Sequence, residues 1–305
     1  MPELPEVETI KLGLQKKIIG LKITKIQILS PKSFQNEKGQ PFDYAQGLRG
    51  RKVLKVWRRA KILGMDLTRV ILSETKDIYS SPSAQNDKGV TLLFHLKMSG
   101  QLIYDDGKRF IGGHPTTDML GKLPNSHTRV IFEFSDNSKL YFNDQRRFGW
   151  IKVVKPGEGI PITLGPEPLE KEFTWQILKK NLLKHKNMPV KVAILDQSVV
   201  AGVGNIYASE ACFNAKLDPR TKVNQLTDKD MKILHRGVLK ALRDGIKYGG
   251  ATRAHFVDSE GKKGYFLDYA KVYWKNGKPC PRDGTEIKKI TLGGRGTYLC
   301  PNCQS

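Results

Sequence analysis

The chain has 305 residues, and 52 lysines and arginines against 30 aspartates and glutamates give it a formal net charge of +22. Its length suits two or three domains, and its 39% hydrophobic content indicates a folded rather than a disordered chain. No apolar run approaches the roughly 18–20 residues of a membrane span, and the acidic start lacks the basic and apolar regions of a signal peptide. We therefore expect a cytoplasmic protein with no membrane partner.

The net positive charge favours binding to a polyanion, and nucleic acid is the first candidate. The alternatives are that the charge serves solubility or attracts the protein to an anionic membrane surface. The basic residues do not form one tail but recur along the chain, which suits a groove that follows a phosphate backbone. They are densest in residues 49–52, 58–61, 146–147 and 179–186.

The first predicted element is a helix over residues 5–19. Its apolar residues Val7, Ile10, Leu14 and Ile18 have helical spacing, and Gly20 ends it. From there to about residue 154 the chain is rich in short runs of branched and aromatic residues, with glycine, aspartate and asparagine between them. This pattern predicts a β-sandwich or barrel. The clearest strands are residues 22–28, 91–96, 129–134 and 139–142.

The remaining segments divide the chain further. Residues 74–89 are polar and predict an exposed loop, and residues 156–168 form a Pro/Gly-rich link. Residues 173–248 read as helices, among them an amphipathic helix over 228–246. We expect three domains: a β-rich one over residues 1–155, a helical one over 156–266 and a small cysteine-bearing end over 267–305.

The last domain has the spacing of a zinc ribbon. Cys280 and Asp283 form one C-x2-C-like knuckle with aspartate in the second position, and Cys300 and Cys303 form the other. A carboxylate oxygen is an acceptable zinc ligand, so we expect one structural Zn²⁺; the alternative is a ribbon that has lost its metal. Residues 293–297 predict a hairpin tip with Arg295, which contacts a phosphate or faces solvent.

Cysteine usage also bears on the compartment. The fourth cysteine, Cys212, lies in an apolar helical context and is predicted to be a buried hydrophobic residue. Because the other three cluster at the end, the chain offers no even disulfide framework, which favours a reducing compartment.

Two further features carry chemistry. The glycine-rich turn in residues 200–207 stands between helical patterns and would bring main-chain N–H groups and a helix N-terminus to an anion such as a DNA phosphate.

Pro2 becomes a secondary α-amine once Met1 is removed. An α-amine titrates near ~8 against ~10.4 for lysine, so roughly a tenth is neutral at pH 7. It can then attack a sugar C1′ to form an iminium ion, with Glu3 moving protons; the alternative is that Pro2 only begins a helix.

These features resemble the formamidopyrimidine-DNA glycosylase family, bacterial base-excision enzymes for oxidised purines, over nearly the whole chain. The resemblance rests on ordered motifs at compatible separations: Pro2-Glu3-Leu4-Pro5-Glu6-Val7-Glu8, Arg58-Arg59-Ala60-Lys61, His95-Leu96-Lys97-Met98-Ser99-Gly100, Asn143-Asp144-Gln145-Arg146-Arg147-Phe148-Gly149, Leu164-Gly165-Pro166-Glu167-Pro168, Gly202-Val203-Gly204-Asn205-Ile206-Tyr207-Ala208-Ser209-Glu210 and the terminal ribbon.

The resemblance implies an α+β fold with an N-terminal β-sandwich that carries the first helix, a helix–two-turn–helix domain and a zinc-ribbon hairpin. It implies a monomeric glycosylase and AP lyase that acts on damaged double-stranded DNA and flips out the lesion. Pro2 would be the nucleophile, Glu3 the acid/base, and Lys61 and Arg295 the residues that assist β- and δ-elimination. The implied DNA contacts are three wedge residues, Met98, Arg146 and Phe148, and three backbone contacts, His127, Lys186 and Asn205.

Three departures from the family pattern bear on these expectations. Asp283 stands where the family has a cysteine, Lys97 stands where some members have glycine, and the 74–89 segment is longer than usual.

Two other functions also stay open. One is the sister endonuclease VIII type, which prefers oxidised pyrimidines; the Leu4-Pro5 start and residues 249–266, which resemble a lesion-capping loop, favour the purine type. The other is a catalytically idle DNA-binding scaffold, against which the intact Pro2, Glu3 and Lys61 argue.

Overall fold

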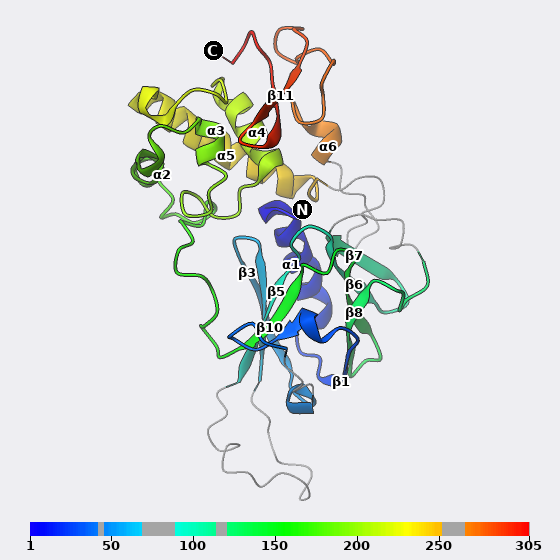
Figure 1. Ribbon diagram of the computed structural model, residues 1–305. Coiled ribbons are helices and arrows are strands. Elements are labelled where there is room, and N and C mark those ends of the chain that lie inside the picture. The colour runs from blue at the N-terminus through cyan, green and yellow to red at the C-terminus, as the bar shows by residue number, and fades with distance from the viewer. Residues whose placement is uncertain (42–45, 69–88, 114–120, 252–265, 305) are drawn as a thin grey trace, which may run out of the picture. The chain divides into compact units, whose positions relative to one another are not determined.

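The computed structural model describes residues 1–41, 46–68, 89–113, 121–251 and 266–304. These residues form two compact units (Figure 1). We call residues 1–2 and 7–160 the β unit, and residues 3–6, 161–251 and 266–304 the helical unit. Most of the 74–89 loop and most of the 249–266 segment lie outside the described residues.

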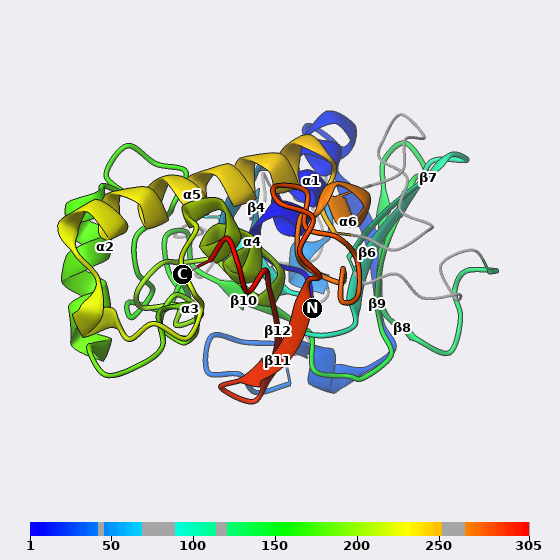
Figure 2. The same cartoon turned by 90° about the horizontal axis from the view of Figure 1, so that it is seen from above.

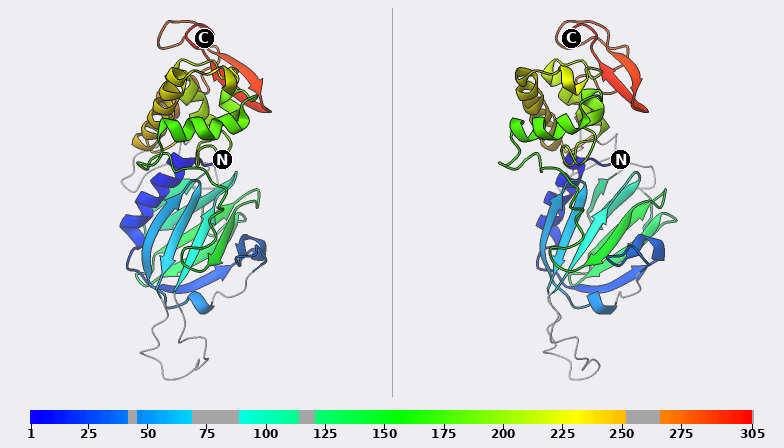
Figure 3. Two further views of the ribbon diagram at one scale, coloured as in Figure 1. Left: turned by 90° about the vertical axis from the view of Figure 1, so that its left-hand side faces the viewer. Right: turned by 60° about the vertical axis from the view of Figure 1, so that its left-hand side comes forward.

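The β unit is a sandwich of two five-stranded sheets (Figure 3). One sheet has the order β1-β8-β9-β6-β7 and is antiparallel throughout. The other has the order β2-β10-β5-β4-β3, in which only the β10–β2 pair is parallel among the described strands. The strands are β1 (Ile23–Ile28), β2 (Phe34–Gln35), β3 (Val53–Arg59), β4 (Ile62–Leu67), β5 (Val90–His95), β6 (Gly100–Asp105), β7 (Arg109–Gly113), β8 (Thr128–Phe134), β9 (Lys139–Asp144) and β10 (Trp150–Val154).

The predicted first helix is present as α1 (Leu4–Ile18), and Gly20 follows it with a φ of +90°. Its apolar stripe from Val7 to Ile18 is buried in the core of the β unit, together with inward residues of both sheets such as Phe94 and Phe132. The alternation of side chains along each strand places these residues on the inner faces. Leu4, in the first turn of the same helix, belongs instead to the core of the helical unit.

The helical unit contains α2 (Trp175–Leu182), α3 (Val190–Ala193), α4 (Asn205–Ala215), α5 (Asp228–Lys247) and α6 (Phe266–Tyr269). The amphipathic helix predicted over 228–246 is confirmed as α5, which begins at a capping box of Thr227 and Asp230 and packs along α4 (Figure 2). Cys212 of α4 is fully buried in this core, as predicted, and burial raises its pKa to about 12. None of the described helices is long and apolar enough to cross a membrane.

The C-terminal hairpin consists of β11 (Lys288–Leu292) and β12 (Arg295–Leu299), with Leu292 paired to Arg295 across a Gly293-Gly294 turn. Its small core includes Phe213 from the end of α4 and Ile287. Arg282 also reaches this helix end: its guanidinium lies 3.9 Å from the Phe213 ring centroid, and its Nη1 donates a hydrogen bond to the Phe213 carbonyl at 2.7 Å. The hairpin is therefore packed onto α4.

Candidate DNA-lesion site and metal centre

Glu3 lies at the N-terminus of α4, although the two are about 200 residues apart in the chain. The buried carboxylate accepts hydrogen bonds from the N–H of Ile206 at 3.1 Å and of Tyr207 at 3.4 Å. Gly204 permits this approach, since a Cβ there would lie 2.2 Å from the carboxylate carbon of Glu3. The glycine-rich turn was expected to approach a DNA phosphate, whereas the group that its N–H donors contact in the structure is the Glu3 carboxylate.

A second buried carboxylate, Glu6, holds Glu3 in place from the same helical turn. Its Oε2 accepts the N–H of Glu3 at 2.7 Å. Its Oε1 accepts the Tyr207 hydroxyl at 2.6 Å and the N–H of Ala251 at 2.6 Å. Burial and the neighbouring Glu6 raise the pKa of Tyr207 well above its ordinary value, so the phenol stays a donor. The sequence offered no local signal for this contact.

The hairpin that carries Arg295 is tied to the same region through Lys191. The Lys191 side chain has no exposed surface and donates hydrogen bonds to Asn205 Oδ1 and, at 3.0 Å, to Thr297 Oγ1. Asn205 Nδ2 in turn donates to the Gly296 carbonyl at 2.9 Å. Burial lowers the pKa of Lys191 to about 8, and the charge of Arg295 acts in the same direction whereas Glu3 opposes it. Glu3, Asn205 and Arg295 are thus brought together, and Lys191 is the member that sequence reasoning missed.

Lys61 lies at the two-residue turn between β3 and β4, where Arg59 pairs with Ile62. Ala60 takes a φ of +54° there, and the Lys61 side chain is buried. His95 pairs with Ile62 on the adjacent strand, and its Nδ1 accepts the N–H of Lys97 at 3.0 Å. Burial, with help from the charges of Lys97 and Lys61, lowers the pKa of His95 to about 3. The His95 imidazole is therefore neutral and carries its proton on Nε2, and it lies near enough to Lys61 to feel that charge. Sequence reasoning also missed this histidine.

The three predicted wedge residues form one exposed cluster on the β unit. Met98 and Phe148 are 44% and 54% exposed, which excludes the alternative that they are core residues. Arg146 joins them: its Nη1 lies 3.2 Å from Met98 Sδ, and its guanidinium lies 5.2 Å from the Phe148 ring centroid. Of the other predicted contacts, His127 is half-buried in the turn before β8, and Lys186 is exposed in the helical unit.

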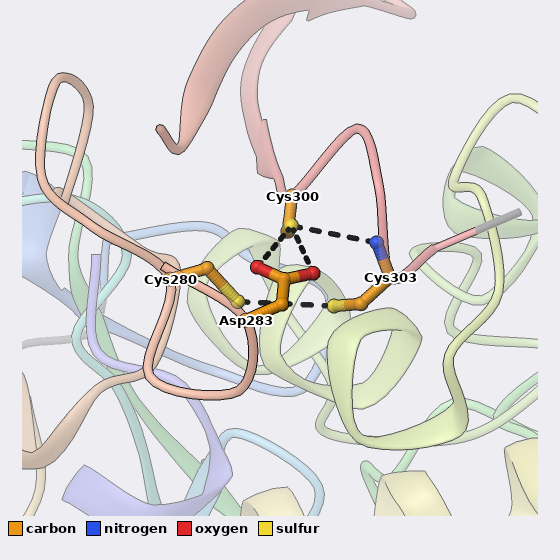
Figure 4. A group of neighbouring side chains, drawn as sticks. All are labelled: Cys280, Asp283, Cys300 and Cys303. Atoms are coloured by element: carbon orange, nitrogen blue, oxygen red, sulfur yellow. Dashed lines mark hydrogen bonds between the residues drawn. The ribbon is translucent and has the colours of Figure 1, made fainter. Parts of the chain in front are cut away.

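The four predicted metal ligands converge on one point (Figure 4). Their ligand atoms all lie within 4.8 Å of one another, with 3.8 Å between the Sγ atoms of Cys280 and Cys303 and 3.5 Å from Cys300 Sγ to each Asp283 oxygen. A tetrahedral zinc ion with Zn–S bonds of about 2.3 Å and Zn–O bonds of about 2.0 Å requires edges of about 3.8 Å and 3.5 Å. The donor set therefore fits Zn²⁺.

Comparisons with known proteins agree with this geometry. Residues 1–151 match the formamidopyrimidine-DNA glycosylase N-terminal domain, residues 164–257 its H2TH domain, and residues 277–305 the zinc finger found in FPG and IleRS. The formamidopyrimidine-DNA glycosylase of Pelotomaculum thermopropionicum is 37% identical over 308 aligned residues, covering 100% of this chain and 99% of that protein. The Bacillus subtilis enzyme is 36% identical with the same coverage.

Solved structures give the same result. A Lactococcus lactis FPG variant in complex with a Fapy-dG-containing DNA matches with a TM-score of 0.80 at 28% identity, covering 100% of both chains. The FPG protein of Thermus thermophilus matches with a TM-score of 0.77 at 31% identity, covering 99% of this chain and 98% of the other. The β-sandwich, the H2TH helices and the ribbon hairpin expected from the sequence are all present. The chain belongs to the formamidopyrimidine-DNA glycosylase family.

Proposed function

We propose that the chain is a bifunctional glycosylase and AP lyase that removes oxidised purines, 8-oxoguanine and formamidopyrimidines, from double-stranded DNA. One observation carries the proposal: Glu3, which directly follows Pro2, is held on the α4 N-terminus next to Asn205, whose side chain bonds to the Arg295 hairpin. Relatives in solved complexes hold DNA with Fapy-dG or an abasic site, which supports the same ligand class for this chain.

The Pro2 amine, freed by removal of Met1, forms a bond to C1′ as the C1′–N9 bond to the damaged purine breaks. The purine leaves after taking up a proton. Loss of the amine proton and opening of the sugar ring, with protonation of O4′, give the iminium ion. Glu3 is the group proposed to move these protons, because it is adjacent to Pro2 in the chain and its carboxylate is held by two main-chain N–H groups.

Strand cleavage then follows in two eliminations. Loss of a C2′ proton with cleavage of the C3′–O bond is β-elimination, which Lys61 assists from the β3–β4 turn. Loss of a C4′ proton with cleavage of the C5′–O bond is δ-elimination, assisted by Arg295 at the exposed hairpin end. The wedge residues fill the space of the extruded nucleotide, which lowers a flipping cost of a few kcal/mol. His127, Lys186 and Asn205 are proposed to contact the DNA backbone.

The zinc ion belongs to this proposal as a structural group, one per chain. Cys280, Asp283, Cys300 and Cys303 would hold it, and it would stabilise the base of the β11–β12 hairpin. Its proposed effect on activity is indirect, because the hairpin presents Arg295 and contacts Asn205 through the Gly296 carbonyl.

Lesion choice is tested by single-turnover excision from 8-oxoguanine:C and thymine-glycol:A duplexes. We expect faster excision of 8-oxoguanine; a preference for thymine glycol would assign the chain to the endonuclease VIII type. Borohydride trapping on the 8-oxoguanine duplex tests the lyase step. Wild-type protein should give a covalent adduct and Pro2→Gly should give almost none, whereas absence of trapping with the wild type would leave only a DNA-binding scaffold.

The role of Lys61 is tested separately with Lys61→Ala. We expect excision of 8-oxoguanine to fall more than cleavage at a preformed abasic site. Equal loss on both substrates would contradict the proposed role.

A further inference from the structure

A buried carboxylate, Asp144, lies at the meeting point of the loops that carry the wedge residues. It has no exposed surface, and its Oδ1 accepts hydrogen bonds from the Ser99 hydroxyl at 2.5 Å and the Arg146 N–H at 3.2 Å. Its Oδ2 accepts the N–H of Gly149 at 2.6 Å. Ser99 follows Met98 and Gly149 follows Phe148 in the chain. One side chain thus bonds to Arg146 itself and to the immediate neighbours of the other two wedge residues.

Ser99 links the two loops directly. Its hydroxyl donates to Asp144 and accepts the N–H of Arg146 at 2.9 Å. Ser99 is buried, so water does not compete readily for these bonds. The loop after β5 and the loop between β9 and β10 are therefore joined through a Ser99–Asp144 pair.

Both loops contain a residue in an unfavourable backbone conformation. Lys97 has a φ of +51° and Arg147 a φ of +58°, in the left-handed region that is unfavourable for a non-glycine residue. Such conformations persist only where surrounding contacts impose them. The bonds to Asp144 span both positions, since Ser99 follows Lys97 by two residues while Arg146 and Gly149 flank Arg147. They are contacts of the kind that can impose these turns.

We propose that Asp144, acting through Ser99, is a positioning residue that holds Met98, Arg146 and Phe148 in register so that they enter the base stack together. This inference rests on the proposed function, because it assigns the wedge its place in lesion extrusion. The main chain of Asp144 extends the arrangement: its N–H donates to the His127 carbonyl at 2.9 Å, and its carbonyl accepts Nε of Arg129 at 2.9 Å. Loss of the pair should impair extrusion from a duplex and spare chemistry at a sugar that is already exposed.

The chain offers a matched control for this pair. In the turn before β9, the buried Ser138 hydroxyl donates to Asp136 Oδ1 at 2.6 Å, so the same kind of Ser–Asp bond is present at the opposite end of the strand that ends in Asp144. Ser138→Ala removes a comparable bond without touching the wedge loops. Ser99→Ala and Asp144→Asn are the test variants. In Asp144→Asn the side-chain amide places an N–H donor among the hydroxyl and main-chain N–H groups that now donate to Asp144, so at least one of those hydrogen bonds is lost.

Two substrates separate positioning from chemistry: an 8-oxoguanine:C duplex and a single-stranded oligonucleotide with an abasic site. Single-turnover rates on the duplex should fall at least tenfold in Ser99→Ala and Asp144→Asn, with single-strand cleavage within twofold of wild type. Ser138→Ala should stay within twofold on both. If Asp144→Asn does not fold, Ser99→Ala decides alone.

Fluorescence of 2-aminopurine placed beside the lesion reports wedge insertion directly, and its rise should be slowed in the same two variants. Equal losses on both substrates, or no loss on either, would overturn the inference. A wild-type protein that forms no adduct with either substrate would instead refute the proposed function, so the two failures are distinguishable.

Discussion

Replacing Asp283 tests whether the ribbon uses a carboxylate as its fourth zinc ligand. Asp283 lies in the cluster at 3.5 Å from Cys300 Sγ, the edge length expected for mixed sulfur and oxygen ligands. A thiolate at this position carries the same charge as the carboxylate. Its zinc bond is about 0.1–0.3 Å longer, which partly compensates for the shorter cysteine side chain. Asp283→Cys should therefore keep four zinc ligands and replace a hard carboxylate oxygen by a soft thiolate, which favours zinc binding.

The expected changes in affinity have opposite signs. Loss of an outer partner of a metal ligand already costs about 10–100-fold in affinity, so loss of the ligand itself in Asp283→Ala should weaken zinc binding by about 100-fold. Asp283→Cys should bind at least about tenfold more tightly than wild type. Competition with a colorimetric chelator measures both constants on the full-length protein.

The matched control is Glu286→Ala, which removes an exposed carboxylate of the same ribbon that pairs with Lys288 at 2.8 Å outside the cluster. Its zinc affinity should equal that of wild type. Wild-type affinity in Asp283→Ala would refute the reasoning, because it would show that three cysteines alone account for metal binding.

Substitutions at three other positions test contacts and backbone conformation in the two units. Tyr207→Phe removes the hydroxyl that bonds to Glu6 at 2.6 Å and should lower the free energy of unfolding by about 2–3 kcal/mol in urea titrations, because a buried carboxylate loses a donor. Lys97→Gly should be at least as stable as wild type and up to about 1 kcal/mol more stable, whereas Lys97→Val should be less stable, because φ is +51° at this position. His95 has a pKa lowered to about 3 by burial, so the folded state stays unprotonated where the unfolded state takes up a proton. Its contribution to stability should be lost as pH falls from about 6.5 towards 3, by up to about 1.4 kcal/mol per pH unit, and His95→Gln should remove that part of the pH dependence.

Three results would contradict these expectations. A change below about 0.5 kcal/mol in Tyr207→Phe would mean that Glu6 replaces the lost bond. Equal stability of the Lys97→Gly and Lys97→Val variants would mean that the turn adjusts to its residue. Parallel pH profiles for wild type and His95→Gln would mean that the imidazole titrates normally in the folded protein.

The regular elements were predictable where spacing and composition act locally. The stripe from Val7 to Ile18 predicted α1, and branched and aromatic runs predicted strands such as β8. The β3–β4 hairpin was not predicted from the residues, because its turn lacks the glycine or asparagine that usually marks a two-residue connection. Ala60 adopts the left-handed conformation there instead, with a φ of +54°.

The chemical groups were easier to identify than their partners. Short motifs marked Pro2, Glu3 and the ribbon ligands, because the residues that define them are close in sequence. The Tyr207 N–H that holds Glu3 is 204 residues away, and no local pattern connects the two. Lys191 was missed for a similar reason: a lysine before an apolar run looks like a solvated charge, whereas in the structure it is buried and bonds to Asn205 of α4 and Thr297 of β12.

Mass spectrometry of the borohydride-reduced complex tests the central claim most directly. After reaction with an 8-oxoguanine duplex, reduction and proteolysis, the sugar remnant should be found on the N-terminal peptide, at the nitrogen of Pro2. Lys61→Ala should carry it at the same position. A remnant on Lys61, on Lys191 or on no residue would contradict the proposed covalent mechanism.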